Sequence, residues 1–274
     1  MRILVTGRGA SGSWQVRGVQ LGNAIGATVK ASATVEEMQA NDIVVVVKRV
    51  TPELAENLRR SRRKIVWDMV DWYRQPNKFS RDELVRQAKD YAAAMGASTL
   101  VAATKRMADD LETPHWLPHH GHARGINQIR ERVSTVVYEG SARYVEDLRP
   151  EIDSLCSKRK WKFVINPPDY LAADIVIALR SKPWDCYASR HWKSGVKLSN
   201  AQITGVPFIG SRESGYLEQA SGTECWADSI EELKLGFELL SPYQARKSAH
   251  DAMLKRSPRL EDVACKYVHL LNSL

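Results

Sequence analysis

Residues 193–218 read Lys193-Ser-Gly-Val-Lys-Leu-Ser-Asn-Ala-Gln-Ile-Thr-Gly-Val-Pro-Phe-Ile-Gly-Ser-Arg-Glu-Ser-Gly-Tyr-Leu-Glu218. The pattern predicts a basic loop, a helix over Leu198–Thr204, a strand over Pro207–Ile209 and a loop that opens a helix over Gly215–Ala220. A helix start exposes unpaired N–H groups and the positive end of the dipole, so two neighbouring starts suit a diphosphate. An ordinary helix–strand–helix piece of an α/β core explains the same spacing.

Working outward, short β-branched runs alternate with helical patterns along the chain. The other predicted strands are Arg2–Thr6, Ala27–Ala31, Ile43–Val47, Lys64–Trp67, Thr99–Ala102, Val133–Tyr138, Lys162–Ile165 and Asp174–Leu179. The other predicted helices are Trp14–Ile25, Pro52–Arg60, Arg81–Met95, Tyr144–Lys158, Ile230–Leu240, Pro242–Leu254 and Leu260–Leu274. Such alternation predicts α/β architecture with parallel sheets flanked by helices.

The alternation breaks once, in the His- and Gly-rich stretch Pro118–Asn127. We therefore expect two Rossmann-like domains that face a cleft, the first over residues 1–125 and the second over residues 126–258. The last segment, residues 259–274, is expected to form a helix that packs back on the first domain.

Composition limits the class of protein. The chain has 274 residues, a net charge of +8 and four cysteines, and the cysteines form no CxxC pair. We expect reduced thiols and a cytoplasmic protein, because no apolar run is long enough to span a bilayer and no signal peptide is evident. The positive charge favours anionic partners, and Arg59–Lys64 is its densest run. A solvated helix end explains that run as well as a patch for a polyanionic acceptor does.

A glycine loop, Gly7-Arg-Gly-Ala-Ser-Gly12, follows the first strand and matches the dinucleotide pattern G-x-G-x-x-G. No acid follows the second predicted strand to bind a ribose, although Lys30 would suit the extra phosphate of NADP. A short-chain dehydrogenase also needs a Tyr-x-x-x-Lys pair near mid-chain, and the chain offers Tyr243 with Lys247 far beyond it. We favour another use for Gly7, Gly9 and Gly12, which the family resemblance described next implies: they let donor and acceptor approach the backbone closely.

Several segments resemble the GT-B glycosyltransferases, in particular the family 4 or group 1 type, in matching order. They are Ile65–Asp71, Ala103–Leu111, Leu117–His120, Val137–Ser141, Lys197–Ala201, Gly205–Ile209 and Gly215–Glu218. The resemblance implies a two-domain enzyme that transfers a sugar from a nucleotide diphosphate to an acceptor hydroxyl. It also implies that no metal ion or organic cofactor is needed and that the donor is a UDP-sugar.

The chain departs from this family at two positions. Many retaining members carry two glutamates, the second just ahead of the glycine–proline step, and Trp192 and Asn200 stand at the matching places. Donor contacts made by those carboxylates must be made otherwise here. The residues themselves therefore leave the sugar, the base of the donor and the stereochemical outcome open, and the UDP-sugar is expected from the resemblance.

The donor site is expected to combine cations, helix starts and small residues. Lys193, Ser194 and Lys197 are expected to hold the diphosphate with backbone N–H groups near Ser199. Asn200 or Glu218 is expected to bind the ribose, and capping of its own helix is the alternative role for Asn200. The remaining donor-site candidates are Gly9, Gly12, Gly140, Arg180, Lys182, Gly215 and Tyr216. A surface ion pair is the alternative role for Arg180 and Lys182.

Three residues are candidates for catalysis. Asp68 and Asp71 end a strand, where α/β sheets place ligands, and one of them would take a proton from the acceptor; Asp71 is ranked first because it lies beyond the apolar run. His119 is expected to touch the donor phosphate or the acceptor. No metal site is expected from the clustered histidines, because adjacent imidazoles point in different directions.

The sequence therefore predicts a metal-independent glycosyltransferase. The charge extends this to DNA modification, with a hydroxylated base in DNA as acceptor. Two alternatives stay open: an NADP-binding dehydrogenase-like protein and a non-enzymatic nucleic-acid-binding module. The oligomeric state is not predicted.

Overall fold

The computed structural model describes residues 1–72, 75 and 78–274, and its contacts divide the chain into two compact units. The first unit comprises Met1–His119, Tyr187–Ser194 and Leu260–Leu274. The second comprises His120–Cys186 and Gly195–Arg259. Each unit holds a parallel five-stranded sheet, so the predicted α/β class with parallel sheets flanked by helices is confirmed.

The first sheet has the strand order β2-β1-β3-β4-β5. Its strands are β1 (Ile3–Gly7), β2 (Thr28–Val29), β3 (Ile43–Val47), β4 (Lys64–Asp68) and β5 (Thr99–Val101). The fully buried, mostly aliphatic strands β1 and β3 lie at its centre. β2 pairs with one side of β1, and β3 pairs with the other side. The strand order therefore reverses at β1, which puts a topological switch point between β1 and β3.

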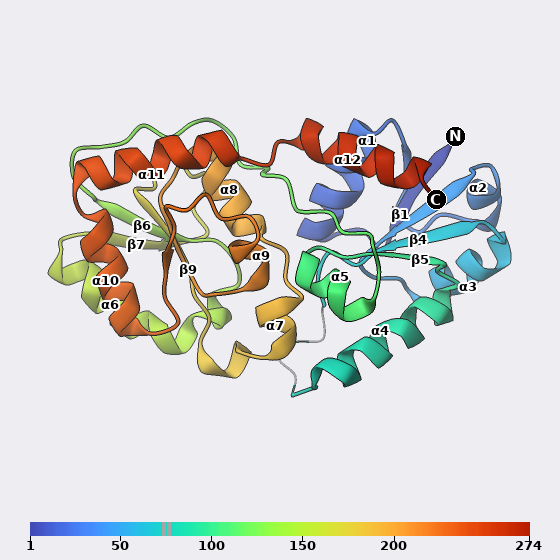
Figure 1. Ribbon diagram of the computed structural model, residues 1–274, viewed down its shortest axis with the longest axis horizontal. Coiled ribbons are helices and arrows are strands. Elements are labelled where there is room, and N and C mark those ends of the chain that lie inside the picture. Colours follow the sequence, from blue (N-terminus) through green and yellow to red (C-terminus); the bar gives the residue numbers. More distant parts are fainter. Residues whose placement is uncertain (73–74, 76–77) are drawn as a thin grey trace. The chain divides into compact units, whose positions relative to one another are not determined.

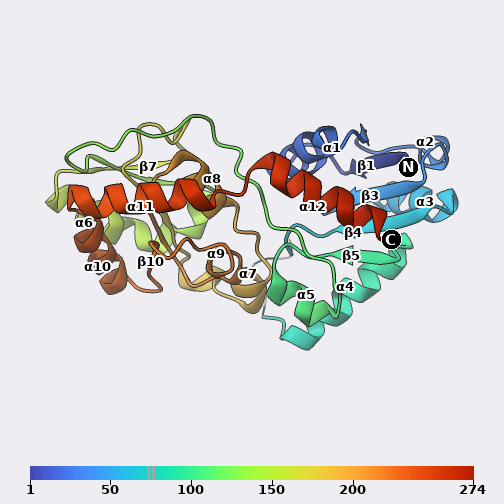
Figure 2. The ribbon, with the colours of Figure 1, turned by 45° about the horizontal axis from the view of Figure 1, so that its top comes forward.

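Helices cover both faces of the first sheet (Figure 1). They are η1 (Trp14–Gln20, a π-helix), α1 (Leu21–Ala24), α2 (Val35–Gln39), α3 (Pro52–Ser61), α4 (Arg81–Met95), α5 (Lys105–Leu111), α7 (Tyr187–His191) and α12 (Leu260–Asn272). The apolar stripe of α12, which includes Val263 and Tyr267, packs with β1 and β3 residues in one core (Figure 2).

Local signals explain where the longest of these helices begins and ends. The Ser80 hydroxyl accepts a hydrogen bond from the Glu83 N–H, and the Glu83 carboxylate accepts one from the Ser80 N–H, which forms a capping box at the start of α4. Gly96 ends α4 in the left-handed conformation, at φ +72°. The predicted bounds Arg81–Met95 are confirmed.

The second sheet has the order β10-β9-β8-β6-β7, so its switch point lies between β6 and β8. Its strands are β6 (Thr135–Tyr138), β7 (Lys162–Ile165), β8 (Ile175–Ala178), β9 (Phe208–Gly210) and β10 (Cys225–Trp226). Its helices are η2 (Ala142–Tyr144), η3 (Glu146–Leu148), α6 (Arg149–Lys158), η4 (Lys182–Trp184), α8 (Val196–Thr204), α9 (Ser214–Leu217), α10 (Ile230–Leu240) and α11 (Tyr243–Arg256). Residues of α6 and α10 pack on one face, and residues of α8 and α11 pack on the other.

Some predicted elements differ from the structure. The helix predicted over Tyr144–Lys158 is α-helical only from Arg149, and two short 3₁₀ turns precede that residue. Proline is tolerated in the first turn of an α-helix, so Pro150 favours a helix start at this point. The helix predicted from Trp14 starts as a π-helix. The short elements α2, α7 and β10 were not predicted.

Candidate functional site

The carboxyl ends of the second sheet carry polar residues around its switch point. Glu139 and Gly140 follow β6, Asn166 follows β7, Arg180 lies just beyond β8, and Glu213 lies beyond β9. Gly140 has φ +133°, and its N–H donates to Asn166 Oδ1 at 2.7 Å. In parallel α/β sheets this edge is the usual place for a ligand.

The starts of α8 and α9 lie against each other within the second unit. A Cβ atom added to Gly195, which precedes α8, would lie 2.2 Å from the carbonyl oxygen of Gly215 in α9. The Ser199 hydroxyl donates to Gln219 Oε1 at 2.8 Å and ties α8 to the residues after α9. The two starts can pack this closely only because residue 195 has no side chain.

Lys197, in the first turn of α8, brings an ammonium group to this edge beside Gly140. Its ammonium lies 4.7 Å from the centre of the Tyr138 ring and 3.4 Å from the Tyr138 hydroxyl. Burial, and then the nearby Arg180 charge, lower the pKa of Lys197 to about 8. Lys197 is therefore a cation at neutral pH that lies against the ring and hydroxyl of Tyr138.

Arg180 is engaged by Glu213. Its Nε and Nη2 atoms donate to the two carboxylate oxygens at 2.5 and 3.0 Å, and both side chains are buried. Of the other predicted donor residues, Lys182 is exposed on η4, Tyr216 is buried against the Phe208 ring, and Glu218 follows α9 at intermediate exposure.

Asn200 is surrounded by partners that the sequence did not indicate. Its Oδ1 accepts the N–H groups of His122 and Ala123 at 2.9 and 3.2 Å, and its Nδ2 donates to Glu139 at 3.0 Å. The Tyr170 hydroxyl donates to the same Glu139 carboxylate at 2.5 Å. Glu139 therefore places a carboxylate directly beside the Asn200 amide.

A cavity of about 580 Å³ opens beside this group. Glu139, Asn200 and His122 line it together with the loop 166–171 that follows β7. Its volume lies within the range of small-molecule sites.

In the first unit, one carboxylate lies between two ammonium groups. Asp71, three residues beyond β4, is 2.5 Å from Lys48 Nζ and 3.2 Å from Lys193 Nζ. Burial alone would raise the pKa of Asp71, but the charges of Lys193 and Lys48 lower it to about 2. Lys193 and the neighbouring Ser194 thus belong to the first unit, whereas Lys197 belongs to the second.

Asp68 and His119 occupy buried positions in the first unit. The Asp68 carboxylate is fully buried, and its Oδ2 lies 3.3 Å from Arg17 Nε. Burial raises the pKa of Asp68, and the Arg17 charge opposes this rise. Arg17 also donates to the carbonyl oxygens of Leu117 and Pro118, just before His119, which is 2% exposed.

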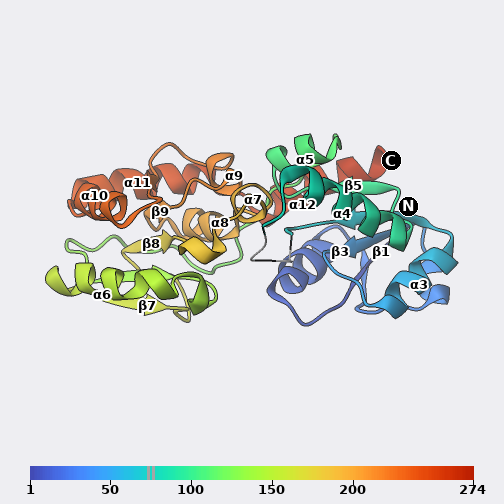
Figure 3. The ribbon, with the colours of Figure 1, turned by 90° about the horizontal axis from the view of Figure 1, so that it is seen from below.

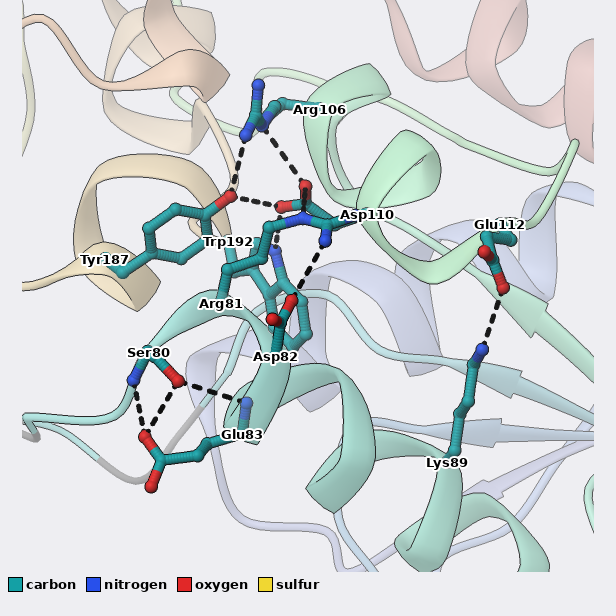
Figure 4. A network of polar contacts seen from close by, with 10 residues as sticks. All are labelled: Ser80, Arg81, Asp82, Glu83, Lys89, Arg106, Asp110, Glu112, Tyr187 and Trp192. Atoms are coloured by element: carbon teal, nitrogen blue, oxygen red, sulfur yellow. Dashed lines mark hydrogen bonds and ion pairs between the residues drawn. The ribbon is translucent and has the colours of Figure 1, made fainter.

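A second network holds the segment that carries Lys193 (Figure 4). Asp110, on α5, accepts hydrogen bonds from Arg81 Nε at 2.8 Å, the Tyr187 hydroxyl at 2.8 Å and Trp192 Nε1 at 2.9 Å. Arg106 donates to the Tyr187 hydroxyl at 2.9 Å and joins α5 to α7, which lies beside it (Figure 3). Burial opposes ionisation of Asp110, but the donors from Arg81, Trp192 and Tyr187 lower its pKa.

The glycine loop lies at the carboxyl end of β1. Gly9 has φ +77°, and a Cβ atom added at Gly12 would meet no atom within 4 Å. Tyr243 and Lys247, the pair that a dehydrogenase would need, lie on α11 of the second unit, and Lys247 pairs with Asp251. The glycine loop and this pair therefore belong to different units.

Across residues 1–72, 75 and 78–274, no group of three or more histidine, cysteine, aspartate or glutamate side chains is placed to hold a metal ion. Within the same residues, no helix combines the length and the apolar character that crossing a membrane requires.

No protein-family model and no curated protein matches the sequence. Solved structures do match it over the whole chain. Anabaena Alr3699/HepE in complex with UDP has a TM-score of 0.64 at 13% identity, with 100% of both chains covered. Trehalose-6-phosphate synthase OtsA has a TM-score of 0.67 at 8% identity, covering 100% of this chain and 99% of that one. A glycosyltransferase from Rickettsia africae has a TM-score of 0.61 at 11% identity, covering 99% and 98%.

The chain has the fold of glycosyltransferases. This is the GT-B fold that the sequence segments indicated, and the recognition of that fold is confirmed. The residues that sequence reasoning missed, Lys48 and Glu139, each follow a predicted strand directly, as Asp68 does. Asp68 and Asp71 were selected because they follow a strand, and the same criterion applied to every strand would also have selected Lys48 and Glu139.

Proposed function

We propose that this protein is a glycosyltransferase that moves a sugar from a UDP-sugar onto an acceptor hydroxyl without a metal ion. The observation that carries the proposal is the full-length likeness to glycosyltransferases, one of them solved with UDP, together with a cavity at the ligand-binding edge of the second sheet. The likeness alone indicates only a fold, so the proposed donor binding is argued from the residues at that edge of the second sheet.

The second unit is proposed to bind the donor. The Lys197 ammonium and the adjacent starts of α8 and α9 would stabilise the charge that builds on the departing diphosphate, the task that a metal ion performs elsewhere. Ser199, Gly215 and Tyr216 would support these starts. Gly140 leaves space beside Lys197, whose Cε atom would lie 3.3 Å from an added Cβ.

The nucleoside is proposed to occupy the cavity beside Glu139 and Asn200. The amide of Asn200 already uses both of its polar atoms within the protein. A carboxylate has about four acceptor positions, so Glu139 keeps capacity for ribose hydroxyls after accepting from Asn200 and Tyr170. Glu139 is therefore proposed as the ribose acceptor, with Asn200 holding it in place.

Asp71 is proposed to act on the acceptor side. It lies beyond the strand and is ionised at neutral pH, whereas Asp68 is enclosed with Arg17 and supports the fold. A pKa of about 2 makes Asp71 a weak base, so its main contribution is to orient an acceptor hydroxyl and to hold Lys48 and Lys193.

A hydroxylated base in DNA is the proposed acceptor. The net charge of +8 supports a polyanionic partner. The test is transfer of labelled sugar from UDP-glucose or UDP-N-acetylglucosamine to duplex DNA with and without hydroxymethylated bases, in the presence of a chelator. Transfer that requires the hydroxylated base supports the proposal, and binding of DNA without turnover favours the non-enzymatic module.

Thermal shifts separate the broader alternatives. Stabilisation by UDP supports donor binding by the second unit. Stabilisation by NADP without any effect of UDP or GDP would instead favour the dehydrogenase.

A further inference from the structure

A basic pocket of about 290 Å³ lies in the first unit, between the glycine loop and the carboxyl end of β3. Residues of the glycine loop, Trp14, and Lys48 and Arg49 beyond β3 are among those that line it. It therefore lies at the switch point between β1 and β3, where doubly wound sheets bind ligands.

Three cationic side chains, Arg8, Lys48 and Arg49, line this pocket, and no carboxylate is among its lining residues. The Asp71 carboxylate contacts both Lys48 and Lys193, so this group of three carries one positive charge in excess. The Lys48 side chain is only 12% exposed. A partly buried excess charge is unfavourable in the free protein and is compensated when an anion binds.

The backbone around the pocket is strained. Ala10 and Lys48 have φ of +47° and +62°, and the buried Val70, next to Asp71, has φ +59°. A β-branched residue in this region is a rare outlier. Strain of this kind persists where the surrounding structure enforces it, and it concentrates at ligand-binding sites.

The chemistry of the lining selects the kind of ligand. Guanidinium groups bind phosphate in a bidentate manner, and a nearby ammonium adds a point charge. The volume falls at the lower end of the range for ligand sites, which suits a phosphate with the group that carries it better than a nucleoside.

We infer that the basic pocket binds a phosphate group of the acceptor. This inference rests on the proposed glycosyltransferase function, because it adds the chemical class of the second substrate. The phosphate belongs either to a phosphorylated small acceptor or to the backbone of a DNA acceptor, and binding experiments distinguish the two sources.

The test compares two double variants of the full chain that lose equal charge. Arg8→Gln with Arg49→Gln removes both guanidinium groups of the pocket. Arg60→Gln with Arg86→Gln removes two exposed arginines, on α3 and α4, and is the control. Calorimetry at fixed ionic strength measures binding of inorganic phosphate, a hexose phosphate, the parent hexose and a short DNA duplex, and thermal unfolding confirms that each variant is folded.

We expect the pocket variant to bind its phosphate ligand at least about ten-fold more weakly than the control, because each charge-assisted hydrogen bond contributes that much or more. A loss confined to the hexose phosphate identifies a small acceptor, and a loss confined to DNA identifies its backbone. Equal affinities of the two variants for every phosphate ligand would overturn the inference. If the pocket variant does not fold, Arg8→Glu, at an exposed side chain, provides the same comparison.

UDP binding, measured in parallel, distinguishes a failure of the proposed glycosyltransferase function from a failure of the inference about the basic pocket. UDP should bind wild type and both variants equally, because its proposed site lies in the second unit. Failure of wild type to bind UDP contradicts the proposed function, whereas retained UDP binding with no role for the pocket contradicts only this inference.

Discussion

The Trp192 indole N–H donates to the Asp110 carboxylate at 2.9 Å, across 82 positions of sequence. This bond holds Tyr187–Ser194 in the first unit, although the residues on both sides of that segment belong to the second. The Trp72 N–H donates to the Trp192 carbonyl oxygen at 3.1 Å, and the two indoles pack edge to face. Lys193 follows directly in the chain and contacts Asp71, so the segment that Asp110 holds also carries a cation of the proposed acceptor side.

Asp110→Ala should lower the free energy of unfolding by about 2–4 kcal/mol, because it leaves the buried Trp192 N–H without its acceptor and removes a carboxylate that Arg81 and Tyr187 also contact. Urea unfolding measures the effect. Asp109→Ala, at the exposed neighbouring position, is the control and should change stability by less than about 0.5 kcal/mol. Equal stability of the two variants would contradict a structural role for the network.

Asp71→Asn should mainly lower the transfer rate, whereas Asp68→Asn should mainly lower stability. The first should lower the transfer rate about 10²-fold or more if Asp71 acts on the acceptor hydroxyl, while UDP binding is retained. The second should mainly lower the free energy of unfolding, because it weakens a fully buried pair with Arg17. Rate measurements beside urea unfolding make the comparison, and unchanged turnover of Asp71→Asn would remove Asp71 from catalysis.

The sequence predicted the sheets well because their signals are local. Strands such as Ile43–Val47 are β-branched runs, and the bounds of α4 are fixed by Ser80 and Gly96. It also selected residues at strand ends, such as Asp71. It did not predict that Lys193 and Lys197, four positions apart, belong to different units, because that division depends on the contact between Trp192 and Asp110.

Asp110 lies within Ala103–Leu111, one of the segments that resemble the family, but it was not among the site residues predicted from the sequence. It lies on a helix among other charged residues, and its partners come from α4, α7 and the residue after α7. Asn200 was predicted as a ribose ligand or a helix cap and was noted as a departure from the family pattern. Its contact with Glu139 depends on the spatial neighbourhood of β6 and α8, which no spacing along the chain reveals.

The affinity for UDP should depend on pH through Lys197. Its pKa of about 8 in the free protein means that the ammonium loses its proton as the pH rises above 8. A bound diphosphate stabilises the charged form, so the pKa is higher in the complex. The affinity should therefore be constant below about pH 8 and then fall by up to about ten-fold per pH unit.

Titration of UDP binding between pH 7 and pH 9.5 in wild type and in Lys197→Arg tests this expectation, since arginine keeps its charge throughout that range. The variant should show a flat profile. A decline of the same slope in both proteins would assign the pH dependence to another group.

Substitutions of Arg180 and Glu213 should have non-additive effects on the free energy of unfolding, because the two side chains form a buried ion pair. Glu213→Gln leaves a buried guanidinium without its counter-charge and should cost about 3–5 kcal/mol. The double variant Arg180→Gln with Glu213→Gln should lose less than the sum of the single variants, which a double-mutant cycle of urea midpoints measures. Additive losses of stability would show that Glu213 is not the main partner of Arg180. Arg180 would then again be a candidate ligand of the diphosphate.

Gly195→Ala should abolish UDP binding. The new methyl group would lie 2.2 Å from the backbone oxygen of Gly215, so the starts of α8 and α9 would have to separate. Their N–H groups could then no longer converge on one diphosphate. Val196→Ala, at the next position, removes atoms instead of adding them and is the control. Calorimetry with UDP distinguishes the two, and thermal unfolding shows whether the variant stays folded; a folded Gly195→Ala protein that binds UDP like wild type would contradict a diphosphate site at these paired helix starts.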